Sequence, residues 1–310
     1  MPTKETKTIY ALNSKLFSKK QYLKNWFKVK RSNGPSEVWK NLVEKKSKKI
    51  VIVNKNKKTW PKNNSRVIFT GDFFDLLPKE LIKSLKKTKL IIGPNIDFNL
   101  FRNYQYLNSF TDIRIIAPCK WVKEYLISNF NLNENVVVVW ASGIDISYWK
   151  AHNSRIQKKY VVIYFKSDSN YELVKKYVSY LKSAGIEALI VEYGKYNNKE
   201  FKNLLEKTLF VIWIGITESQ SIAQFQIWSM NVPTFVLKQD KFVIGEKTYF
   251  ASSSPYLTSN TGLFFEGNTS AERNIELWLE RVGSFSPRDW VKANYTNEIA
   301  ENRLFELFEF

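Results

Sequence analysis

Residues 209–237 read LFVIWIGITESQSIAQFQIWSMNVPTFVL. The run opens with a continuously apolar segment at 209–215 and continues into a polar Thr-Glu-Ser-Gln-Ser turn. An amphipathic helical pattern follows at 219–230, and a second apolar segment follows at 233–237. A strand, a helix and a second strand in this order are typical of a βαβ unit, whose parallel strands are buried on both faces.

The same alternation extends outward through the second half of the chain. Strands are predicted at 160–165 and 188–193, and helices at 171–183, 198–208, 270–281 and 288–309. Gly185 is predicted to end the helix at 171–183, because glycine readily takes the left-handed conformation that closes a helix. The second half is therefore predicted to be a doubly wound α/β domain.

The first half shows the same pattern. Strands are predicted at 50–53, 66–70, 89–92, 113–116 and 136–140, and helices at 36–47, 78–87 and 119–129. The glycine and polar run within 141–158 are typical of a domain junction. The sequence thus predicts an α/β fold of two doubly wound domains, residues 1–150 and 151–287, that face a cleft at the carboxyl ends of their strands.

The charge of the chain is unevenly distributed. The 310 residues carry a net charge of +19. Residues 1–150 contain 29 Lys and Arg against 11 Asp and Glu, whereas the remaining residues contain 19 against 18. An AT-rich genome would enrich lysine in both halves alike, so the excess is interpreted as a property of the first domain. It predicts a positive field that attracts anionic partners.

Composition argues against several classes of protein. No apolar run approaches the roughly 20 residues of a membrane-spanning helix, and the first residues lack the apolar core of a signal peptide. We therefore expect a cytoplasmic protein. Cys119 and His152 are the only residues of their types, which argues against an intramolecular disulfide or a Cys/His metal site. Cys119 is interpreted as a small core residue rather than an activated thiol. Neither a GxGxxG motif nor a P-loop is present.

The turn at 217–221 is a candidate anion site. Its hydroxyl groups and the free N–H groups that begin the following helix suit a phosphate. Glu218 stands at the entry and Gln226 lies eight residues later, so one helix face could carry both toward a ligand. An alternative interpretation is a helix cap, with Thr217 or Ser219 as the N-cap and Glu218 as a first-turn carboxylate.

The segment from Glu218 to Pro233 resembles the donor-site segment of GT-B glycosyltransferases of family 4. That family has a Glu, a turn of small residues, a second Glu eight positions later and a Pro-led strand. Glu218 matches the first Glu, and residues 219–222 match the phosphate-contacting turn. Gln226 stands in place of the second Glu; it can still hydrogen-bond to a ribose diol but lacks the charge.

Other segments resemble the same family in the same order. They are the Asn-Gly-Pro loop and helix at 32–42, the segment at 117–126, the Gly-Ile-Asp turn within 136–150, and the segment at 286–308, which is similar to a closing helix that returns to the first domain. The resemblance covers most of the chain. It implies a GT-B fold of two Rossmann-like domains, in which residues 288–310 join the first domain.

The resemblance also implies an activity and a set of site residues. A sugar would pass from a nucleotide-sugar donor on the second domain to an acceptor on the first, with retention of configuration and without a metal or other cofactor. Glu218 and Lys166 are the implied catalytic residues, with Lys166 as the cation beside the leaving diphosphate. Tyr193 or Tyr196 would stack on the base. The implied donor-binding residues are Ser219, Gln220, Ser221, Ile222, Gln226, Tyr193, Gly194, Gly34 and Pro35, and the acceptor-side candidates are Asn95 and Asp97.

The basic first half would then be the acceptor half. Its lysine-rich, partly apolar segments, such as 15–31 and 79–89, could lie on an anionic membrane surface. The predicted acceptor is anionic or lipid-linked, which would make the protein peripheral to the inner face of the membrane, or else an acidic polysaccharide without membrane contact.

Two other classes stand as alternatives. Gln226 and the lack of a histidine in residues 1–150 suit a GT-B protein that binds nucleotide or glycan without catalysis. Basic segments with interleaved aromatic residues could bind nucleic acid, although the sequence carries no recognised nucleic-acid-binding motif.

Overall fold

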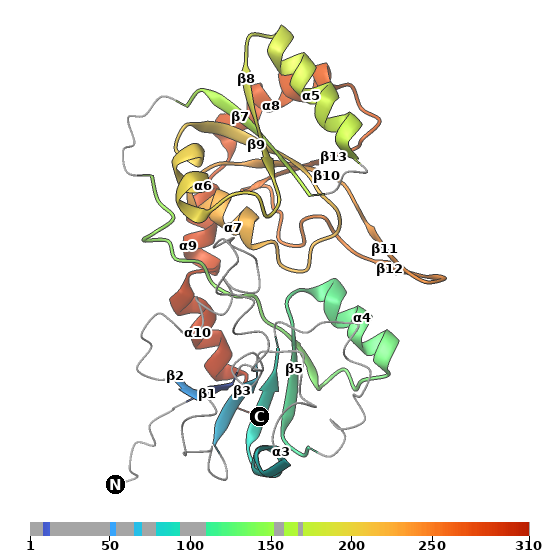
Figure 1. Ribbon diagram of the computed structural model, residues 1–310, viewed down its shortest axis with the longest axis vertical. Helices are drawn as coiled ribbons and strands as arrows, with labels where there is room; N and C mark the ends of the chain where they lie inside the picture. The colour runs from blue at the N-terminus through green and yellow to red at the C-terminus, as the bar shows by residue number, and fades with distance from the viewer. Residues whose placement is uncertain are drawn as a thin grey trace. The chain divides into compact units, whose positions relative to one another are not determined.

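The structure, a computed structural model, describes residues 9–12, 50–53, 65–69, 79–93, 110–151, 158–166 and 170–309. The chain forms two compact units (Figure 1). Among the described residues, unit 1 holds those up to Ser142 and those from Glu298 onward, and unit 2 holds Gly143–Asn297. The chain therefore leaves unit 1, builds unit 2 and returns to unit 1 for its last helix.

Unit 1 is built on a six-stranded parallel sheet. Its strands are β1 (Ile9–Leu12), β2 (Ile50–Val53), β3 (Arg66–Phe69), β4 (Lys89–Ile92), β5 (Ile113–Ala117) and β6 (Val137–Val139), in the spatial order β2-β1-β3-β4-β5-β6. The five strands predicted for this half are confirmed to within one residue at their ends. Strand β1 was not predicted, because Ile-Tyr-Ala-Leu lacks the run of β-branched residues that marks a strand such as β2.

Helices α3 (Lys79–Leu85) and α4 (Lys120–Phe130) belong to the same unit. The helix predicted at 119–129 is confirmed as α4, and apolar residues at three- and four-residue spacing place one set of its side chains in the core. These buried residues are Trp121, Val122, Tyr125, Leu126 and Phe130. The helix predicted at 36–47 lies outside the described residues.

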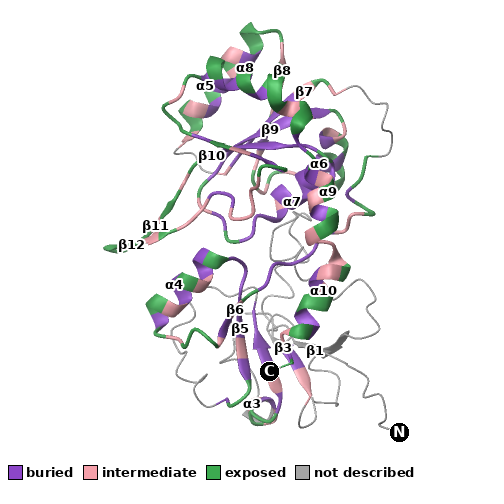
Figure 2. Cartoon of the chain, turned by 180° about the vertical axis from the view of Figure 1, so that it is seen from behind, coloured by how far each residue is buried: buried purple, intermediate pink, exposed green. Residues whose placement is uncertain are grey.

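Helix α10 (Asn297–Glu306) covers the unit 1 sheet from the other end of the chain. Leu304 and Phe308 are fully buried in one cluster with strand residues such as Ile91. The buried indole Nε1 of Trp140 donates a hydrogen bond to the Ala300 carbonyl oxygen at 2.8 Å. Figure 2 shows the buried surface of α10 in purple. The end of the chain thus supplies part of the first core.

Unit 2 carries a second parallel sheet. Its strands are β7 (Tyr160–Phe165), β8 (Glu187–Glu192), β9 (Thr208–Ile214), β10 (Thr234–Leu237) and β13 (Gly262–Phe265), in the spatial order β13-β10-β9-β7-β8. The chain runs from β7 outward to β8, and then crosses to β9 on the other side of β7. In doubly wound sheets, ligands bind at such a switch point, beyond the carboxyl ends of the two strands that flank it, here β7 and β9.

The helices of unit 2 agree largely with the predicted ones. They are α5 (Tyr171–Ser183), α6 (Asn198–Leu205), α7 (Ile222–Ser229), α8 (Ala271–Arg281) and α9 (Pro287–Asn294), with a short 3₁₀ turn at Val282–Ser284. The stop at Gly185 is confirmed: its φ is +71°, and its N–H donates to the Lys182 carbonyl oxygen at 3.1 Å. Val161, Ile163, Phe210 and Trp278 are among the fully buried residues of the core.

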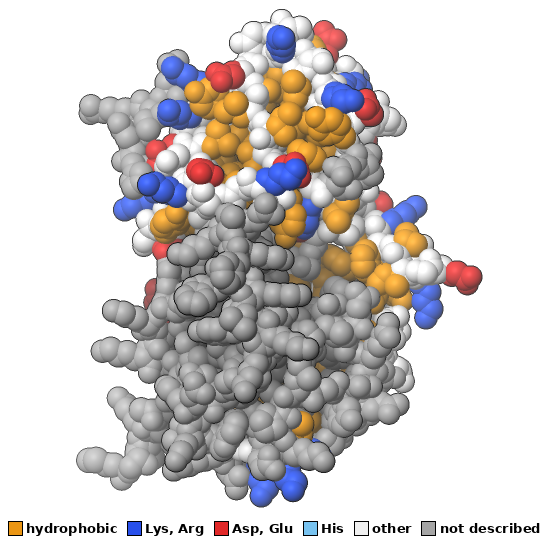
Figure 3. Space-filling model, viewed as in Figure 1, with side chains coloured by type: hydrophobic (Ala, Val, Ile, Leu, Met, Phe, Trp, Pro, Cys, Tyr) orange, Lys and Arg blue, Asp and Glu red, His pale blue; other side chains and the backbone are white. Residues whose placement is uncertain are grey.

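An antiparallel hairpin, absent from the sequence prediction, leaves the sheet after β10. It consists of β11 (Lys241–Ile244) and β12 (Lys247–Phe250). Val243 and Phe250 lie on one face of the hairpin and are 62% and 83% exposed. Figure 3 shows hydrophobic side chains at the surface of this hairpin. The two residues of the connecting loop, Gly245 with φ +58° and Glu246, are the sequence signal that could have predicted it.

The single helix predicted at 288–309 is in fact two helices, α9 and α10, which lie in different units. Between them, Thr296 forms a parallel bridge with Ile144. The Ile144 N–H donates to the Tyr295 carbonyl oxygen at 2.9 Å, and its carbonyl oxygen accepts from the Asn297 N–H at 3.2 Å. A Cβ atom at Gly143 would lie 2.5 Å from the Thr296 carbonyl oxygen, so the close approach requires glycine. The helical periodicity of 288–309 does not reveal this long-range pairing.

Candidate active site

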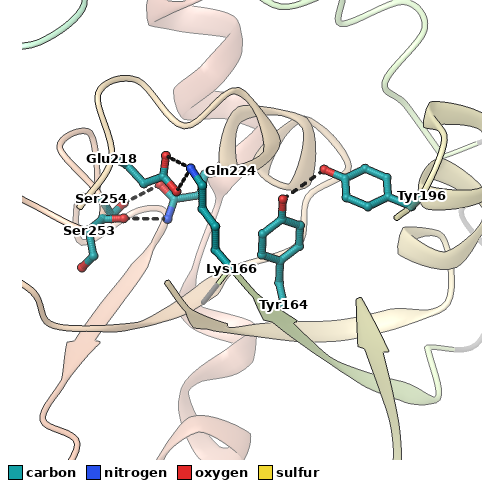
Figure 4. A network of polar contacts seen from close by, with 7 residues as sticks. All are labelled: Tyr164, Lys166, Tyr196, Glu218, Gln224, Ser253 and Ser254. Carbon is teal, nitrogen blue, oxygen red and sulfur yellow. Dashed lines mark hydrogen bonds and ion pairs between the residues drawn. The ribbon is translucent and has the colours of Figure 1, made fainter. Parts of the chain in front are cut away.

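Lys166 and Glu218 form an ion pair at the switch point of the unit 2 sheet. Lys166 directly follows β7, and Glu218 lies in the turn after β9, the neighbouring strand. The Lys166 Nζ lies 2.9 Å from Oε1 and 3.0 Å from Oε2 of Glu218 (Figure 4). Because β7 and β9 are parallel neighbours, the segments that follow their carboxyl ends lie at one edge of the sheet, and these two side chains meet there. The sequence had predicted both residues for the site, and the fold brings them together.

The pair is largely withdrawn from water. The side chain of Glu218 is 8% exposed and that of Lys166 is 21% exposed. Burial raises the pKa of the Glu218 carboxyl, and the Coulombic attraction and hydrogen bond of the Lys166 ammonium group oppose that rise. A buried carboxylate of this kind depends on its cation, since an unpaired charge in a low-dielectric environment is strongly unfavourable.

Helix α7 begins beside this pair, three residues later than predicted. Ser221 is its N-cap, with a left-handed φ of +63°, and its side chain makes no capping hydrogen bond. The alternative interpretation is therefore wrong: neither Thr217 nor Ser219 is the cap, and Glu218 lies outside the helix. Its carboxylate and the Gln226 side chain are consequently not placed on one helical face.

The start of α7 has the features of an anion site. The N–H groups of its first residues, Ile222 and Ala223, have no acceptor within the helix. The Ser221 hydroxyl is buried and has no hydrogen-bond partner within the described part of the chain. Backbone N–H groups at a helix start, an unpartnered hydroxyl and a positive dipole end together suit an anionic oxygen.

The remaining predicted residues of this turn and helix differ in exposure. Ser219 is exposed, whereas Gln220 and Ile222 are buried. Gln226 is buried in the middle of α7, with 2% of its surface exposed. Ser219 is therefore the residue of this turn that solvent reaches most freely.

Tyr193 and Gly194 follow β8 at the same edge of the sheet. The Lys166 Nζ lies 4.5 Å from the centroid of the Tyr193 ring, a distance at which a cation is attracted to an aromatic face. Gly194 has a φ of +75°, which turns the chain away from the strand. Tyr196 is directed elsewhere: its hydroxyl group lies 3.1 Å from that of the buried Tyr164. Of the two tyrosines proposed to stack on a base, only Tyr193 is shown beside Lys166.

Gln224, Ser253 and Ser254 were not among the predicted site residues, yet hydrogen bonds join them beside the start of α7. The buried Ser254 hydroxyl donates to Gln224 Oε1 at 2.7 Å, and Gln224 Nε2 donates to the Ser253 carbonyl oxygen at 3.3 Å. The Ser-Ser-Ser run at 252–254 is visible in the sequence, but nothing local connects it to α7. The hairpin β11–β12 separates the two segments in the chain.

Several predicted residues lie outside the described residues: Gly34 and Pro35 of the proposed donor set, Asn95 and Asp97 of the acceptor set, and His152. Cys119 is described, and it is buried. Burial raises the pKa of its thiol to about 12, so the group is a neutral core residue, in agreement with the prediction.

Metal clusters and membrane-spanning helices are both absent from the described residues. In this part of the chain, no three His, Cys, Asp or Glu side chains are grouped so as to hold a metal ion. Among the same residues, no helix is both long and apolar enough to cross a membrane.

Comparison with known proteins bears on the fold. No protein-family model matches the sequence, and no curated protein matches it. Solved structures do. A glycosyltransferase from Rickettsia africae has a TM-score of 0.60 at 12% identity, with 98% of each chain covered. The lipopolysaccharide outer core galactosyltransferase WaaB has a TM-score of 0.51 at 11% identity, covering 97% of this chain and 98% of its own.

A third structure is the catalytic domain of starch synthase IV from Arabidopsis thaliana, bound to ADP and acarbose. Its TM-score is 0.53 at 9% identity, covering 81% of this chain and 73% of that one. Likenesses at this level of identity show the fold. The predicted fold class is therefore confirmed: the chain is an α/β protein of the GT-B type, with two Rossmann-like units.

Proposed function

We propose that this protein is a glycosyltransferase that binds a nucleotide sugar at the carboxyl edge of the unit 2 sheet. The observation that carries the proposal is the Lys166–Glu218 ion pair beside the start of α7. A cation, a carboxylate and free N–H groups converge there at the switch point, on a fold shared with glycosyltransferases. The assignment to family 4 belongs to the same proposal and rests on the motif from Glu218 to Pro233.

The chemistry of glycosyl transfer suits these groups. The bond between the anomeric carbon and the diphosphate breaks as negative charge develops on the leaving group, so fixed donors and cations lower the barrier. Lys166 and the N–H groups of Ile222 and Ala223 would supply them, with the Ser221 hydroxyl as a further donor. Glu218 would accept hydrogen bonds from the sugar hydroxyls, and Tyr193 would contact the base.

The finer features of the reaction come from the resemblance and the charge of the chain. We propose retention of configuration, no essential metal or cofactor, and Gln226 as the residue facing the ribose. The net charge of +18 in residues 1–150 favours an anionic or lipid-linked glycan acceptor, bound on the cytoplasmic side of a membrane. Gly34, Pro35, Asn95 and Asp97 are proposed to contact donor and acceptor from the first domain.

A second candidate is a GT-B protein that binds nucleotide or glycan without transferring sugar. It is favoured by Gln226, which is neutral where the family has a carboxylate. The two candidates differ in one variant. Gln226→Glu would raise the turnover of a weakly active enzyme, whereas it would leave a non-catalytic protein inactive.

The test is a thermal-shift panel with UDP, GDP, ADP, CMP, dTDP and their common sugars, first with EDTA and then with magnesium. A ligand at 100 times its dissociation constant stabilises the folded state by about 2.7 kcal/mol. We expect a clear shift with one nucleotide that EDTA does not abolish. A flat panel for every nucleotide and sugar in both buffers would contradict the proposal.

A further inference from the structure

The backbone of Glu218 is held by a segment distant in sequence. Its N–H donates to the Ser252 carbonyl oxygen at 2.7 Å. Ser252 is the first residue of a serine segment, residues 252–254, which follows β12. The position of the Glu218 carboxylate beside Lys166 therefore depends on where the serine segment lies.

One buried side chain joins the serine segment to α7. Gln224, the third residue of the helix, accepts a hydrogen bond from the Ser254 hydroxyl at 2.7 Å and donates one to the Ser253 carbonyl oxygen at 3.3 Å (Figure 4). Gln224 is fully buried and Ser254 nearly so. Polar groups this deep have no water with which to exchange partners, so the link fixes both segments.

The other attachment of the serine segment is to the end of β10. The Ser253 hydroxyl donates to the Leu237 carbonyl oxygen at 2.6 Å and accepts from the Gln239 N–H at 3.2 Å. The Ser253 N–H donates to the Gln239 carbonyl oxygen at 3.0 Å. The serine segment thus bridges the sheet, the start of α7 and the backbone of Glu218.

We infer that Gln224 and Ser254 are positioning residues for Glu218, acting through the Ser252 carbonyl oxygen. They touch neither Lys166 nor the carboxylate of Glu218 through the hydrogen bonds described. Instead, they fix the turn that carries Glu218 against the helix start that would hold the diphosphate. The catalytic meaning of this placement rests on the proposed function, in which the sugar and the phosphate must be held at a fixed separation.

The inference predicts a coupling that can be measured without any substrate. The interaction between Lys166 and Glu218 is obtained from a double-mutant cycle of unfolding with Lys166→Met and Glu218→Gln. We expect this coupling free energy to fall by about half or more when the cycle is repeated in a Ser254→Ala background, because contacting networks are not additive. An unchanged coupling would overturn the inference.

Two further variants serve as a control and as a replacement for a variant that does not fold. Thr208→Val removes another buried hydroxyl bond of unit 2, from Thr208 Oγ1 to the Leu204 carbonyl oxygen at 2.8 Å, and should leave the coupling unchanged. If Ser254→Ala does not fold, the pair Gln224→Met with Ser254→Ala replaces it, since removing both partners avoids an unsatisfied buried amide. If the Lys166–Glu218 coupling in this double variant equals that of the parent protein, the inference is also overturned.

Turnover separates this inference from the proposed function. The nucleotide sugar found in the thermal-shift panel serves as the substrate. Ser254→Ala should lower kcat of donor hydrolysis about 10-fold or more and should change KM by a smaller factor. In a Glu218→Gln background it should add no further loss. Additive losses would show a merely structural role. If the parent binds no nucleotide sugar, the proposed function fails while the Lys166–Glu218 coupling still decides the positioning role.

Discussion

The Lys166 ammonium group contacts both carboxylate oxygens of Glu218, at 2.9 and 3.0 Å, at the carboxyl ends of the neighbouring strands β7 and β9. Because β7 and β9 are neighbours, their carboxyl ends deliver these two charges to one place. The pair is buried enough for each charge to depend on the other. This dependence leads to predictions that need no knowledge of the substrate.

Lys166→Met should destabilise the protein by about 3–5 kcal/mol, the usual cost of leaving a buried charge without its partner. The cost should depend on pH. Without the ammonium group, burial raises the folded-state pKa of Glu218 further above its unfolded value of about 4.3. A carboxyl with a raised folded pKa loses stability as pH rises above the unfolded value. Urea unfolding should therefore show a larger loss at pH 8 than at pH 5. An equal loss at both values would contradict this account of the pair.

Glu218→Gln should cost less stability than Lys166→Met. The amide needs no counter-ion, and the Lys166 side chain, at 21% exposure, can turn toward water more easily than the nearly buried Glu218. Urea unfolding of the two variants at neutral pH measures the difference. A larger loss for Glu218→Gln would mean that the lysine, rather than the carboxylate, is the group dependent on the pair.

Gly143→Ala should destabilise the protein by about 1–3 kcal/mol, the range for forcing an extra group into a packed interior. The added Cβ would meet the Thr296 carbonyl oxygen at 2.5 Å and the Asn297 Cα at 2.6 Å, both of which are backbone atoms. Gly283→Ala is the matched control, because a Cβ there meets no atom within 4 Å. Thermal unfolding of both variants decides the matter: equal melting temperatures would show that the bridge at Ile144 tolerates a side chain.

Cys119 should be unreactive in the folded protein. Its thiol is buried and its pKa is raised to about 12, so almost no thiolate exists at neutral pH. A disulfide reagent such as Ellman's should label it slowly at pH 8 and rapidly after unfolding in urea. Rapid labelling of the folded protein would mean that the start of α4 opens to solvent.

Local sequence was sufficient for nine of the described strands and for most of the described helices, whereas β1, β11, β12 and β13 were not predicted. Runs such as YVVIYF at 160–165 and the stripe of α4 are decided by their own periodicity. The pairing of Lys166 with Glu218 was also within reach, since both follow strands that the alternation predicts to be parallel.

Long-range contacts account for what the sequence did not reveal. The break between α9 and α10 depends on Ile144, which lies far back in the chain. The late start of α7 depends on the left-handed Ser221, an uncommon conformation for serine. The hydrogen bond between Gln224 and Ser254 joins segments on either side of the hairpin at 241–250. No residue of the hairpin indicates this contact.

The most direct test of the central claim is calorimetric titration of nucleoside diphosphates into the wild-type protein and two variants. Lys166→Met combined with Glu218→Gln removes both charges without leaving one unpaired, and Thr208→Val is the control. We predict that at least one diphosphate binds the wild type and Thr208→Val equally. Its affinity for the double variant should fall about 10- to 100-fold, as expected for the loss of a charge-assisted hydrogen bond worth about 1.5–3 kcal/mol. Equal binding to all three proteins, or no binding to the wild type, would contradict a donor site at Lys166 and Glu218.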